Sequence, residues 1–315
     1  MQDRVTLVVR TYNRARLVSR AIDSALGQTY PNVDVIVVDD GSTDGTPDVL
    51  RAYEGEPRIR VVRHARNKGP NAAGNTGIAH LGAETRYFGL ADSDDTLEPD
   101  AVETLVRAFE ASDDRYSLVL GWGRDMEKGD TTGQMTHLPG REGVVTYEDA
   151  LAGHFRGDFW LLVERELLGG LRFDERARGA EGSVWWRLLR ERPGWLVPEV
   201  VMNCTRSGSD RLSIPRYDRD VARGLMWAEQ AMLDAVGADL RRTYPRTYAG
   251  ALSALAKWAA LAGEGARARA ASRQAFRYAR SRRTLLILLV VLVPQPLLRR
   301  LAESRRDLRV LRDPA

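Results

Sequence analysis

Residues 33–44 read VDVIVVDDGSTD, and this stretch decides the fold. Five of its first six residues are aliphatic, which is typical of a strand buried on both faces of a sheet. Acidic and turn-forming residues follow directly. The same order, an apolar run and then a polar cluster, occurs in residues 5–14, 59–69 and 86–95. The chain therefore begins with four short strands that each end in polar residues.

Segments with a helical spacing of apolar residues accompany these strands. They cover residues 17–26, 47–53, 71–81 and 99–111. This alternation predicts an α/β fold that is Rossmann-like, with a mostly parallel central sheet and helices on both faces. Ligands bind such sheets at the carboxyl ends of the strands, so the four polar clusters are expected to meet at one edge.

The middle of the chain has a weaker pattern. Residues 117–122, 157–163 and 195–204 have the composition of strands, and residues 181–190 that of a short helix. Residues 121–143 are rich in Gly and polar side chains, which favours a long loop.

Helices are expected between residues 219 and 280. Ala-, Leu- and Arg-rich segments with helical periodicity predict an antiparallel helical bundle. These segments are residues 219–236, 241–263 and 266–280. The expected organisation is an α/β domain over residues 1–212, a helical extension over 213–283 and an apolar, basic tail over 284–315.

Charge and cysteine content narrow the setting. The net charge is only +4, yet 13 Arg and three acidic residues lie between Ala266 and the end. The single Cys204 excludes an intramolecular disulfide and fits a reducing compartment. The first residues lack the basic stretch and long apolar core of a signal peptide, so a cytoplasmic location is expected.

The tail combines an apolar run with arginines. Residues 284–298 are apolar but short for a bilayer-spanning helix, and Pro294 and Pro296 interrupt them. Arginines on both sides favour a helix that lies in the interface of an anionic membrane, here the inner face of the cell membrane. The alternative is a helix packed on the bundle or buried in a homodimer. The apolar run makes a membrane, and not nucleic acid, the expected partner of the basic charge.

The cluster after the fourth strand indicates a metal. Asp92, Asp94 and Asp95 place three carboxylates within four residues, and such like charges repel unless a cation neutralises them. Hard oxygen ligands suit Mg²⁺ or Mn²⁺, which also bridge phosphate oxygens. The alternative role is capping of the helix that begins near Pro99.

The other clusters indicate a nucleotide. A carboxylate after the second strand would lie beside a bound nucleobase and accept a ring N–H. No Gly-x-Gly-x-x-Gly follows the first strand, which argues against a dinucleotide dehydrogenase. No Gly-Lys-Ser/Thr loop is present, which argues against a P-loop enzyme.

Taken together, these motifs resemble family 2 glycosyltransferases with the GT-A fold. The resemblance rests on VVRTYNR (residues 8–14), VVDDGSTDGT (37–46), RNKG (66–69) with NTGI (75–78), and LADSDD (90–95), in order over about the first hundred residues. It implies inverting transfer of a sugar from a UDP-, GDP- or dTDP-sugar to a saccharide or lipid-linked acceptor, of the kind that bacterial polysaccharide or glycolipid synthesis uses. Asp92–Asp94 matches the DXD motif of such enzymes.

The resemblance also implies roles for individual residues. Thr11, Tyr12 and Arg14 would line the nucleoside pocket. Asp40, with Asp39, would contact the base. The remaining roles are donor or loop positioning by Arg66, Asn67 and Asn75, ribose and metal contact by Asp92, and metal binding on the diphosphate by Asp94 and Asp95.

Inversion requires a base that takes the proton of the acceptor hydroxyl. In the family, a carboxylate of a Glu-Asp pair at the start of a helix supplies it. Glu181 matches the first position, while Gly182 departs from the pattern at the second. The alternative for Glu181 is charge complementarity with a helix N-terminus. Asp174 and Asp158 are the reserve candidates.

Two further alternatives follow from the same region. Gly182 leaves open a catalytically silent nucleotide-sugar-binding protein of the same fold, although the intact acidic cluster argues against it. The Gln-x-x-Arg-Trp signature of processive synthases is missing, so a single addition is expected. Trp185, Trp186 and Trp195 either stack on an acceptor sugar or belong to the core.

Overall fold

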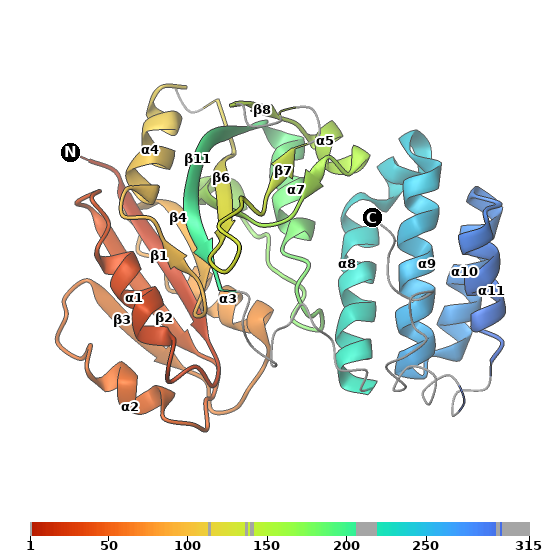
Figure 1. Cartoon of the computed structure of the whole chain (residues 1–315), viewed down its shortest axis with the longest axis horizontal. Helices are drawn as coiled ribbons and strands as arrows, with labels where there is room; N and C mark the ends of the chain where they lie inside the picture. The colour runs from red at the N-terminus through yellow and green to blue at the C-terminus, as the bar shows by residue number, and fades with distance from the viewer. Residues whose placement is uncertain are drawn as a thin grey trace. The chain divides into compact units, whose positions relative to one another are not determined.

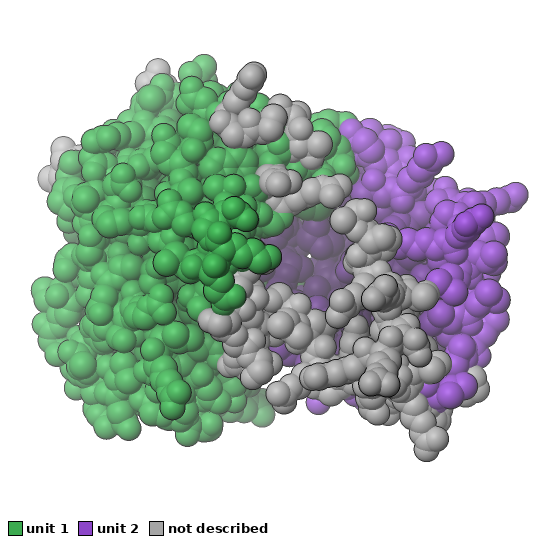
Figure 2. Space-filling model, in the orientation of Figure 1, with its two compact units in different colours: residues 1–175, 184–208 green, residues 176–183, 209–315 purple. Residues whose placement is uncertain are grey.

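The computed structural model describes residues 2–112, 115–135, 138, 142–205, 219–293 and 297 (Figure 1). Two compact units make up the chain (Figure 2). The first consists of residues 1–175 and 184–208, and the second of residues 176–183 and 209–315. The expected boundary at residues 212 and 213 lies outside the described residues, so that division of the chain stays a prediction.

Four neighbouring parallel strands form one half of the sheet in the first unit. Their order across the sheet is β3-β2-β1-β4, and each pair runs in the same direction. They are β1 (Arg4–Thr11), β2 (Val33–Asp39), β3 (Ile59–Arg63) and β4 (Thr85–Asp92). All four strands expected in this part of the chain are therefore present, and the α/β prediction is confirmed.

Helices cover both faces of this half of the sheet. Along β1, Val5, Leu7 and Val9 pack into the same apolar cluster as the buried side chains of two helices. The intervening Val8 belongs to a cluster that includes Ala73 of another helix. Period-2 alternation in a strand with two buried faces gives this division. The helices are α1 (Val18–Leu26) and α4 (Ala101–Glu110) on one side, α3 (Pro70–Ala79) on the other, and α2 (Thr46–Arg51) after β2.

Helix α3 contains glycine for a packing reason. A Cβ built on Gly77 would lie 2.2 Å from Cγ1 of Val8 in β1. Glycine costs helix stability, but here it lets the helix backbone approach the sheet. The approach brings the start of α3 to the carboxyl ends of β1 and β2.

The other half of the sheet is mixed. Strand β10 pairs antiparallel with both β4 and β6, whereas β11 is parallel to β6. The short β5 and β8 are antiparallel to β11. The bounds of these strands are β5 (Thr96–Leu97), β6 (Leu118–Asp125), β8 (Gly143–Val145), β10 (Phe159–Glu164) and β11 (Gly194–Cys204).

The loop expected over residues 121–143 is partly wrong. Strand β6 continues through this glycine-rich stretch to Asp125, and β7 (Gln134–Met135) pairs with β9 (Phe155–Arg156). A Cβ on Gly121 would lie 2.8 Å from the methyl groups of Val201. The glycine thus serves close packing against β11, which composition alone does not distinguish from a turn.

Three short helices complete the first unit or join it to the second. Thr146 caps α5 through a reciprocal pair of hydrogen bonds with Asp149, the arrangement known as a capping box. Helix α7 matches the helix expected over residues 181–190. The bounds are α5 (Tyr147–Ala152), α6 (Arg165–Leu168) and α7 (Gly182–Glu191).

The second unit is helical, as expected. Its helices follow one another with short connections and bury an Ala-rich core that includes Ala256, Ala259 and Ala268. None of the described helices is long and apolar enough to cross a bilayer. The helices are α8 (Arg219–Thr243), α9 (Pro245–Ala262), α10 (Gly265–Tyr278) and α11 (Arg282–Val290).

The start of the expected tail packs with this bundle. Ile287 and Val291 are buried in the same cluster as the alanines of α9 and α10. A capping box between Ser281 and Thr284 begins α11. Except for Leu297, the tail after residue 293 lies outside the described residues.

Candidate functional site

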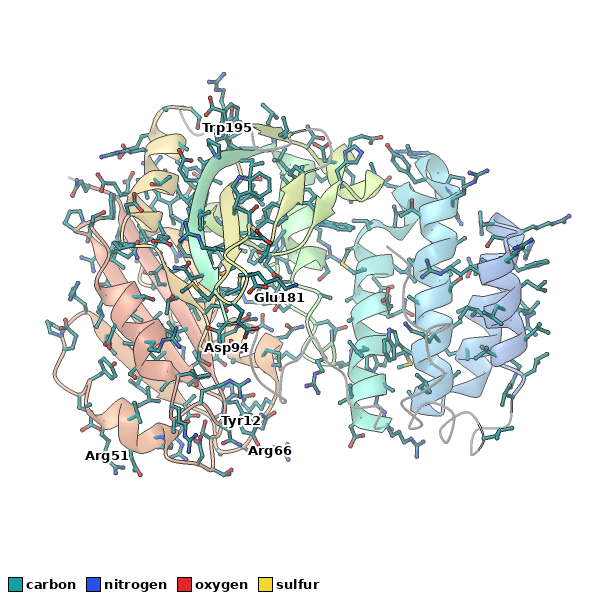
Figure 3. All side chains as sticks on the ribbon, viewed as in Figure 1. Tyr12, Arg51, Arg66, Asp94, Glu181 and Trp195 are labelled. Atoms are coloured by element: carbon teal, nitrogen blue, oxygen red, sulfur yellow. The ribbon has the colours of Figure 1, made fainter. Side chains whose placement is uncertain are left out.

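The four polar clusters lie at the carboxyl ends of β1, β2, β3 and β4, which are neighbours in the sheet. Figure 3 shows Tyr12, Arg66 and Asp94, one residue from each of three clusters, at this same end of the strands. Parallel strands bring residues distant in sequence to one edge. The edge expected to bind a ligand is therefore assembled as expected.

The first two clusters are tied together through Asn13. Its backbone N–H donates to Ser42 Oγ at 2.9 Å, and its side-chain oxygen accepts from the N–H of Thr43 at 2.8 Å. Asn13 has a φ of 52°, a left-handed conformation that asparagine tolerates better than most residues. Gly41 has a φ of 73°, and a Cβ there would lie 2.5 Å from the carbonyl carbon of Arg66. Glycine at this position lets the second and third clusters approach.

Asp40 is a buried acceptor inside this assembly. One carboxylate oxygen accepts from the backbone N–H of Lys68 at 2.8 Å and lies 2.7 Å from His64 Nδ1. The other accepts from the N–H of Gly69 at 2.7 Å. The side chain thus holds the third cluster against the second. Its expected contact with a nucleobase stays a prediction.

His64 extends this network to α3. A carboxylate only accepts hydrogen bonds, so Nδ1 of His64 carries the proton that it shares with Asp40. Its Nε2 lies 2.9 Å from the hydroxyl of Thr76. The four histidines of the sequence do not have the spacing of metal ligands, so none of them was expected in the site. A spacing pattern does not detect His64, because its partner is a carboxylate 24 residues away.

Asp39 is fully buried and has a different partner. One of its oxygens accepts from the N–H of Ser42 at 2.9 Å, and the other lies 3.2 Å from Nε of Arg63. Arg63 also donates to the carbonyl of Ser42 at 2.9 Å. The Asp39 oxygen near Arg63 is buried and makes no hydrogen bond among the described residues, so the contact with the exposed guanidinium is an ion pair only.

The fourth cluster is more open. The Asp92 side chain is 48% exposed and that of Asp94 is 27% exposed. Arg10 Nη2 lies 2.6 Å from Asp92 Oδ1, and Arg14 Nη2 lies 3.8 Å from Asp94 Oδ2. Arg10, near the end of β1, therefore pairs with Asp92 at the end of β4. Arg14, after β1, lies near Asp94, which follows β4. Arg14 was expected to line the nucleoside pocket, whereas no role was expected for Arg10.

Asp95 is the most perturbed carboxyl of the cluster. Burial, followed by the negative charges of Asp92 and Asp94, raises the pKa of Asp95 to about 7. Asp158 adds to this shift with a third negative charge, and the N–H of Thr205 opposes it by donating to Asp95 at 3.0 Å. Burial and the neighbouring carboxylates thus favour the protonated, uncharged form of Asp95. A bound cation would relieve the repulsion among these carboxylates.

Metal binding would use part of this cluster. Within the part of the chain that the structure describes, no group of three His, Cys, Asp or Glu side chains is assembled in metal-binding geometry. Mg²⁺ is commonly held by one or two carboxylates together with substrate phosphates, so a complete protein cage is not required. The oxygen donors of Asp94 and Asp95 fit such an ion.

The remaining expected donor residues have mixed surroundings. Tyr12 is 40% exposed, and Arg66 and Asn67 are also exposed. The Thr11 hydroxyl is buried and has no hydrogen-bond partner among the described residues. Asn75 exchanges hydrogen bonds with the backbone of Phe173, both at 2.9 Å. Asn75 therefore fixes the segment before residue 176.

Glu181 directly precedes α7. Gly179 and Ala180 before it have φ values of 81° and 69°, and a non-glycine residue in the left-handed region is strained. Strain of this kind clusters at functional sites, although the role of Glu181 as a base stays a prediction. The reserve candidate Asp158 is close enough to Asp95 to affect its pKa.

Two of the three tryptophans considered for acceptor binding, Trp185 and Trp195, pack against the hydrophobic core. Trp185 makes an edge-to-face contact with Phe173, with ring centroids 5.4 Å apart. Trp195 stacks on Tyr116 at 5.3 Å and lies at the opposite end of the sheet from Asp94 (Figure 3). These contacts favour the packing alternative.

Known proteins resemble this chain in sequence and in fold. The family model of Glycosyl transferase family 2 matches residues 6–169, just over half of the chain. The succinoglycan biosynthesis protein ExoO of Rhizobium meliloti (strain 1021) is 43% identical over 190 residues, 57% of this chain and 53% of that protein. The putative teichuronic acid biosynthesis glycosyltransferase TuaG of Bacillus subtilis (strain 168) is 30% identical over 193 residues, 59% of this chain and 72% of that protein. The match thus spans only about half of the first relative.

Solved structures show the fold. S. aureus TarS 1–349 in complex with UDP-GlcNAc has a TM-score of 0.60 and 18% identity, covering 95% of this chain and 88% of that chain. The mannosyltransferase PcManGT from Pyrobaculum calidifontis in complex with GDP-Man and Mn²⁺ has a TM-score of 0.53 and 20% identity, covering 98% and 88%. The α/β unit has the GT-A fold, and the sequence match shows that this chain belongs to glycosyl transferase family 2.

Proposed function

We propose that this protein is an inverting, divalent-metal-dependent glycosyltransferase. It takes a sugar from a UDP-, GDP- or dTDP-sugar and transfers it, in a single addition, to a saccharide or lipid-linked acceptor in polysaccharide or glycoconjugate synthesis. The observation that carries the proposal is the open carboxylate cluster of Asp92, Asp94 and Asp95 beside three further polar clusters at one sheet edge. The names of the relatives ExoO and TuaG support the class of product.

The donor would bind across the ends of β1, β2 and β4. The exposed ring of Tyr12 offers a face for a nucleobase. The buried Asp39 oxygen that makes no hydrogen bond among the described residues would accept an imino N–H of that base. Mn²⁺ or Mg²⁺, held by Asp94 and Asp95, would neutralise charge on the leaving diphosphate. The other proposed donor contacts come from Thr11, Arg14, Asp40, Arg66, Asn67, Asn75 and Asp92.

Transfer needs a proton acceptor on the side of the acceptor sugar. The Glu181 carboxylate would take the proton of the acceptor hydroxyl as its oxygen attacks the anomeric carbon. The bond to the diphosphate breaks on the opposite face, so the configuration at that carbon inverts. Support for Glu181 comes from its match to the family's base position, and from the strained backbone of Ala180 directly before it.

A direct assay tests the function as a whole. The protein is incubated with UDP-, GDP- and dTDP-sugars, with Mn²⁺ or with excess EDTA, and release of the nucleoside diphosphate is measured. We expect release with one nucleotide class, in Mn²⁺ only. Undiminished turnover in EDTA would contradict the metal role, and tight donor binding without turnover would favour the silent sugar-nucleotide binder.

Replacing the base separates binding from transfer. Glu181→Gln is expected to lower the transfer rate by about 10²- to 10⁴-fold, the usual contribution of a general base, while donor affinity stays unchanged. Glu191→Gln, at the exposed far end of α7, is the matched control. Transfer by the Glu181 variant within about threefold of the unmodified protein would instead direct attention to Asp158 and Asp174.

We also propose that α11 attaches the enzyme to the inner, cytoplasmic face of a membrane, close to a lipid-linked acceptor. Ile287 of the helix and Val291 directly after it are buried, while the other side of this segment is apolar and exposed. Exposed arginines lie just before the helix and in its first turn, which suits an anionic lipid surface. The exposed apolar residues are Leu285, Leu286, Leu289 and Leu292, and the arginines are Arg280, Arg282 and Arg283.

Flotation with vesicles tests this attachment. Leu289→Ser combined with Leu292→Ser should weaken binding to vesicles containing phosphatidylglycerol by about tenfold or more, because two leucines no longer leave water. Val61→Ser, an exposed valine on β3, is the control. Equal flotation of all three proteins would contradict the proposal. If the double variant instead dissociates a dimer in light scattering, this face is a subunit contact.

A further inference from the structure

Arg10 is the buried cation of the strand ends. Its side chain is only 9% exposed, and its Cα is the direct partner of Asp92 in the β1–β4 register. Both residues therefore point to the same face of the sheet, where the Arg10 stem runs beneath α3. A Cβ on Gly74 of that helix would lie 3.7 Å from Cδ of Arg10. The sheet and helix thus fix the guanidinium beside the Asp92 carboxylate, 2.6 Å away.

The pair combines unequal environments. Asp92 is about half exposed, whereas Arg10 is almost completely enclosed. Arginine stays charged even when enclosed, and its charge acts over a longer range in a low-dielectric interior than at the surface. Its ion-pair partner Asp92 belongs to the carboxylate cluster, in which Arg14 also lies beside Asp94. Arg10 is therefore a permanent positive charge on the buried side of the carboxylate cluster.

We propose that Arg10 is a positioning residue of the donor site that holds Asp92 in place and limits how tightly the carboxylate cluster binds a divalent ion before the donor arrives. The inference rests on the proposed metal-dependent function. A nucleoside diphosphate brings negative charge of its own, which offsets the repulsion between Arg10 and the ion. The ion is then bound strongly only together with the diphosphate, and it can leave with the product.

Binding of Mn²⁺ without any sugar donor tests the proposal. Free Mn²⁺ is measured by electron paramagnetic resonance with the unmodified protein, Arg10→Met, Arg10→Lys and Arg51→Met. Arg51 pairs with Asp48 on the surface of α2 and is the matched control. We expect Arg10→Met to bind Mn²⁺ about tenfold more tightly, because a cation near the ion is removed. Arg10→Lys, which keeps the charge, and Arg51→Met should stay within about threefold of the unmodified protein.

The same titrations with UDP or GDP present complete the test. Nucleoside diphosphate should strengthen Mn²⁺ binding to the unmodified protein several-fold more than it does for Arg10→Met. Arg10→Met combined with Asp92→Asn should return the donor-free affinity toward that of the unmodified protein, since the released carboxylate is then neutral. Unchanged or weaker Mn²⁺ binding by Arg10→Met would overturn the proposal. If that variant does not fold, Arg10→Gln takes its place with the same expectations.

Failure of the proposed function would look different. If the unmodified protein binds no Mn²⁺ even with UDP or GDP, the metal part of the proposed function fails. The inference about Arg10 is then decided by its variant alone. Mn²⁺ binding gained by Arg10→Met supports Arg10 as the residue that opposes the ion, and no binding by either protein overturns that role.

Discussion

The acidic pair after β2 and the acidic cluster after β4 lie at the same edge of one sheet but in opposite electrostatic states. Asp40 is buried and accepts hydrogen bonds from backbone N–H groups as well as from His64. Burial, followed by the negative charges of Asp92 and Asp94, raises the pKa of Asp95 to about 7. The hydrogen bonds of Asp40 are made without a ligand, whereas a bound cation would relieve the repulsion among the carboxylates after β4. Neutralising a carboxylate should therefore have opposite consequences at the two sites.

The largest effect is expected in activity at the β4 cluster. Asp94→Asn and Asp95→Asn should each lower turnover by roughly 10³-fold, because the charge that stabilises the leaving diphosphate is no longer held. Asparagine at position 95 retains an oxygen that can accept from the N–H of Thr205, so the fold should persist. Turnover is measured with saturating Mn²⁺, with Asp48→Asn on the surface of α2 as control. Activity within tenfold of the unmodified protein would remove the distinction between the two sites.

The next effect is expected in stability at the β2 pair. Asp40→Ala leaves the Nδ1–H of His64 and two backbone N–H groups without their acceptor, which should cost about 3 kcal/mol of unfolding free energy. Urea unfolding followed by tryptophan fluorescence measures it, since five of the seven tryptophans lie in the first unit. Asp48→Ala should cost under about 0.5 kcal/mol. An equally small loss for Asp40→Ala would show that Asp40 is not structural.

The sequence predicts the first half of the sheet because each strand there is a closed local unit. An aliphatic run such as residues 33–38 can only be buried, and the polar residues that follow it must lie at its carboxyl end. All four clusters then converge by topology alone. In the middle of the chain, glycines such as Gly121 and Gly123 mark close strand packing and not a loop, and this depends on β11, about eighty residues later.

The site is predictable to the level of residue type but not of partner. The motifs identify Asp40 and Asp92 as important, while the structure shows that His64 and Arg10 are their partners. Arg10 lies within the VVRTYNR motif without an assigned role, and His64 lies outside the motifs. The pairing itself is not visible in the sequence, because each pair forms across strands. In hindsight, Arg10 carries a signal: it falls in phase with Val8 on a strand buried on both faces, where a cation requires a partner.

A further effect is expected in the pH dependence of stability, and it follows from Asp95. The pKa of its carboxyl is about 7 in the folded protein against an ordinary value of 3.8, so the folded state holds more protons between these pH values. Without metal, unfolding free energy should therefore fall as pH rises from about 4 to 7 through this residue, and then level off. Asp95→Asn should lack this loss and be the more stable protein at pH 8.

Metal binding should show the same group with the opposite sign. An ion bound to Asp95 must displace its proton, so Mn²⁺ affinity in the presence of UDP or GDP should rise by up to about tenfold per pH unit below pH 7 and change little above it. Calorimetry in two buffers of different ionisation enthalpy measures the proton released, which should approach one per ion at pH 6 and vanish near pH 8. Asp48→Asn, on the surface of α2 and away from the cluster, should leave this release unchanged. A release that does not depend on pH between 6 and 8 would mean that Asp95 is not a ligand. The ion would then rest on Asp94 and the diphosphate, and the contrast between the two acidic sites would be one of exposure alone.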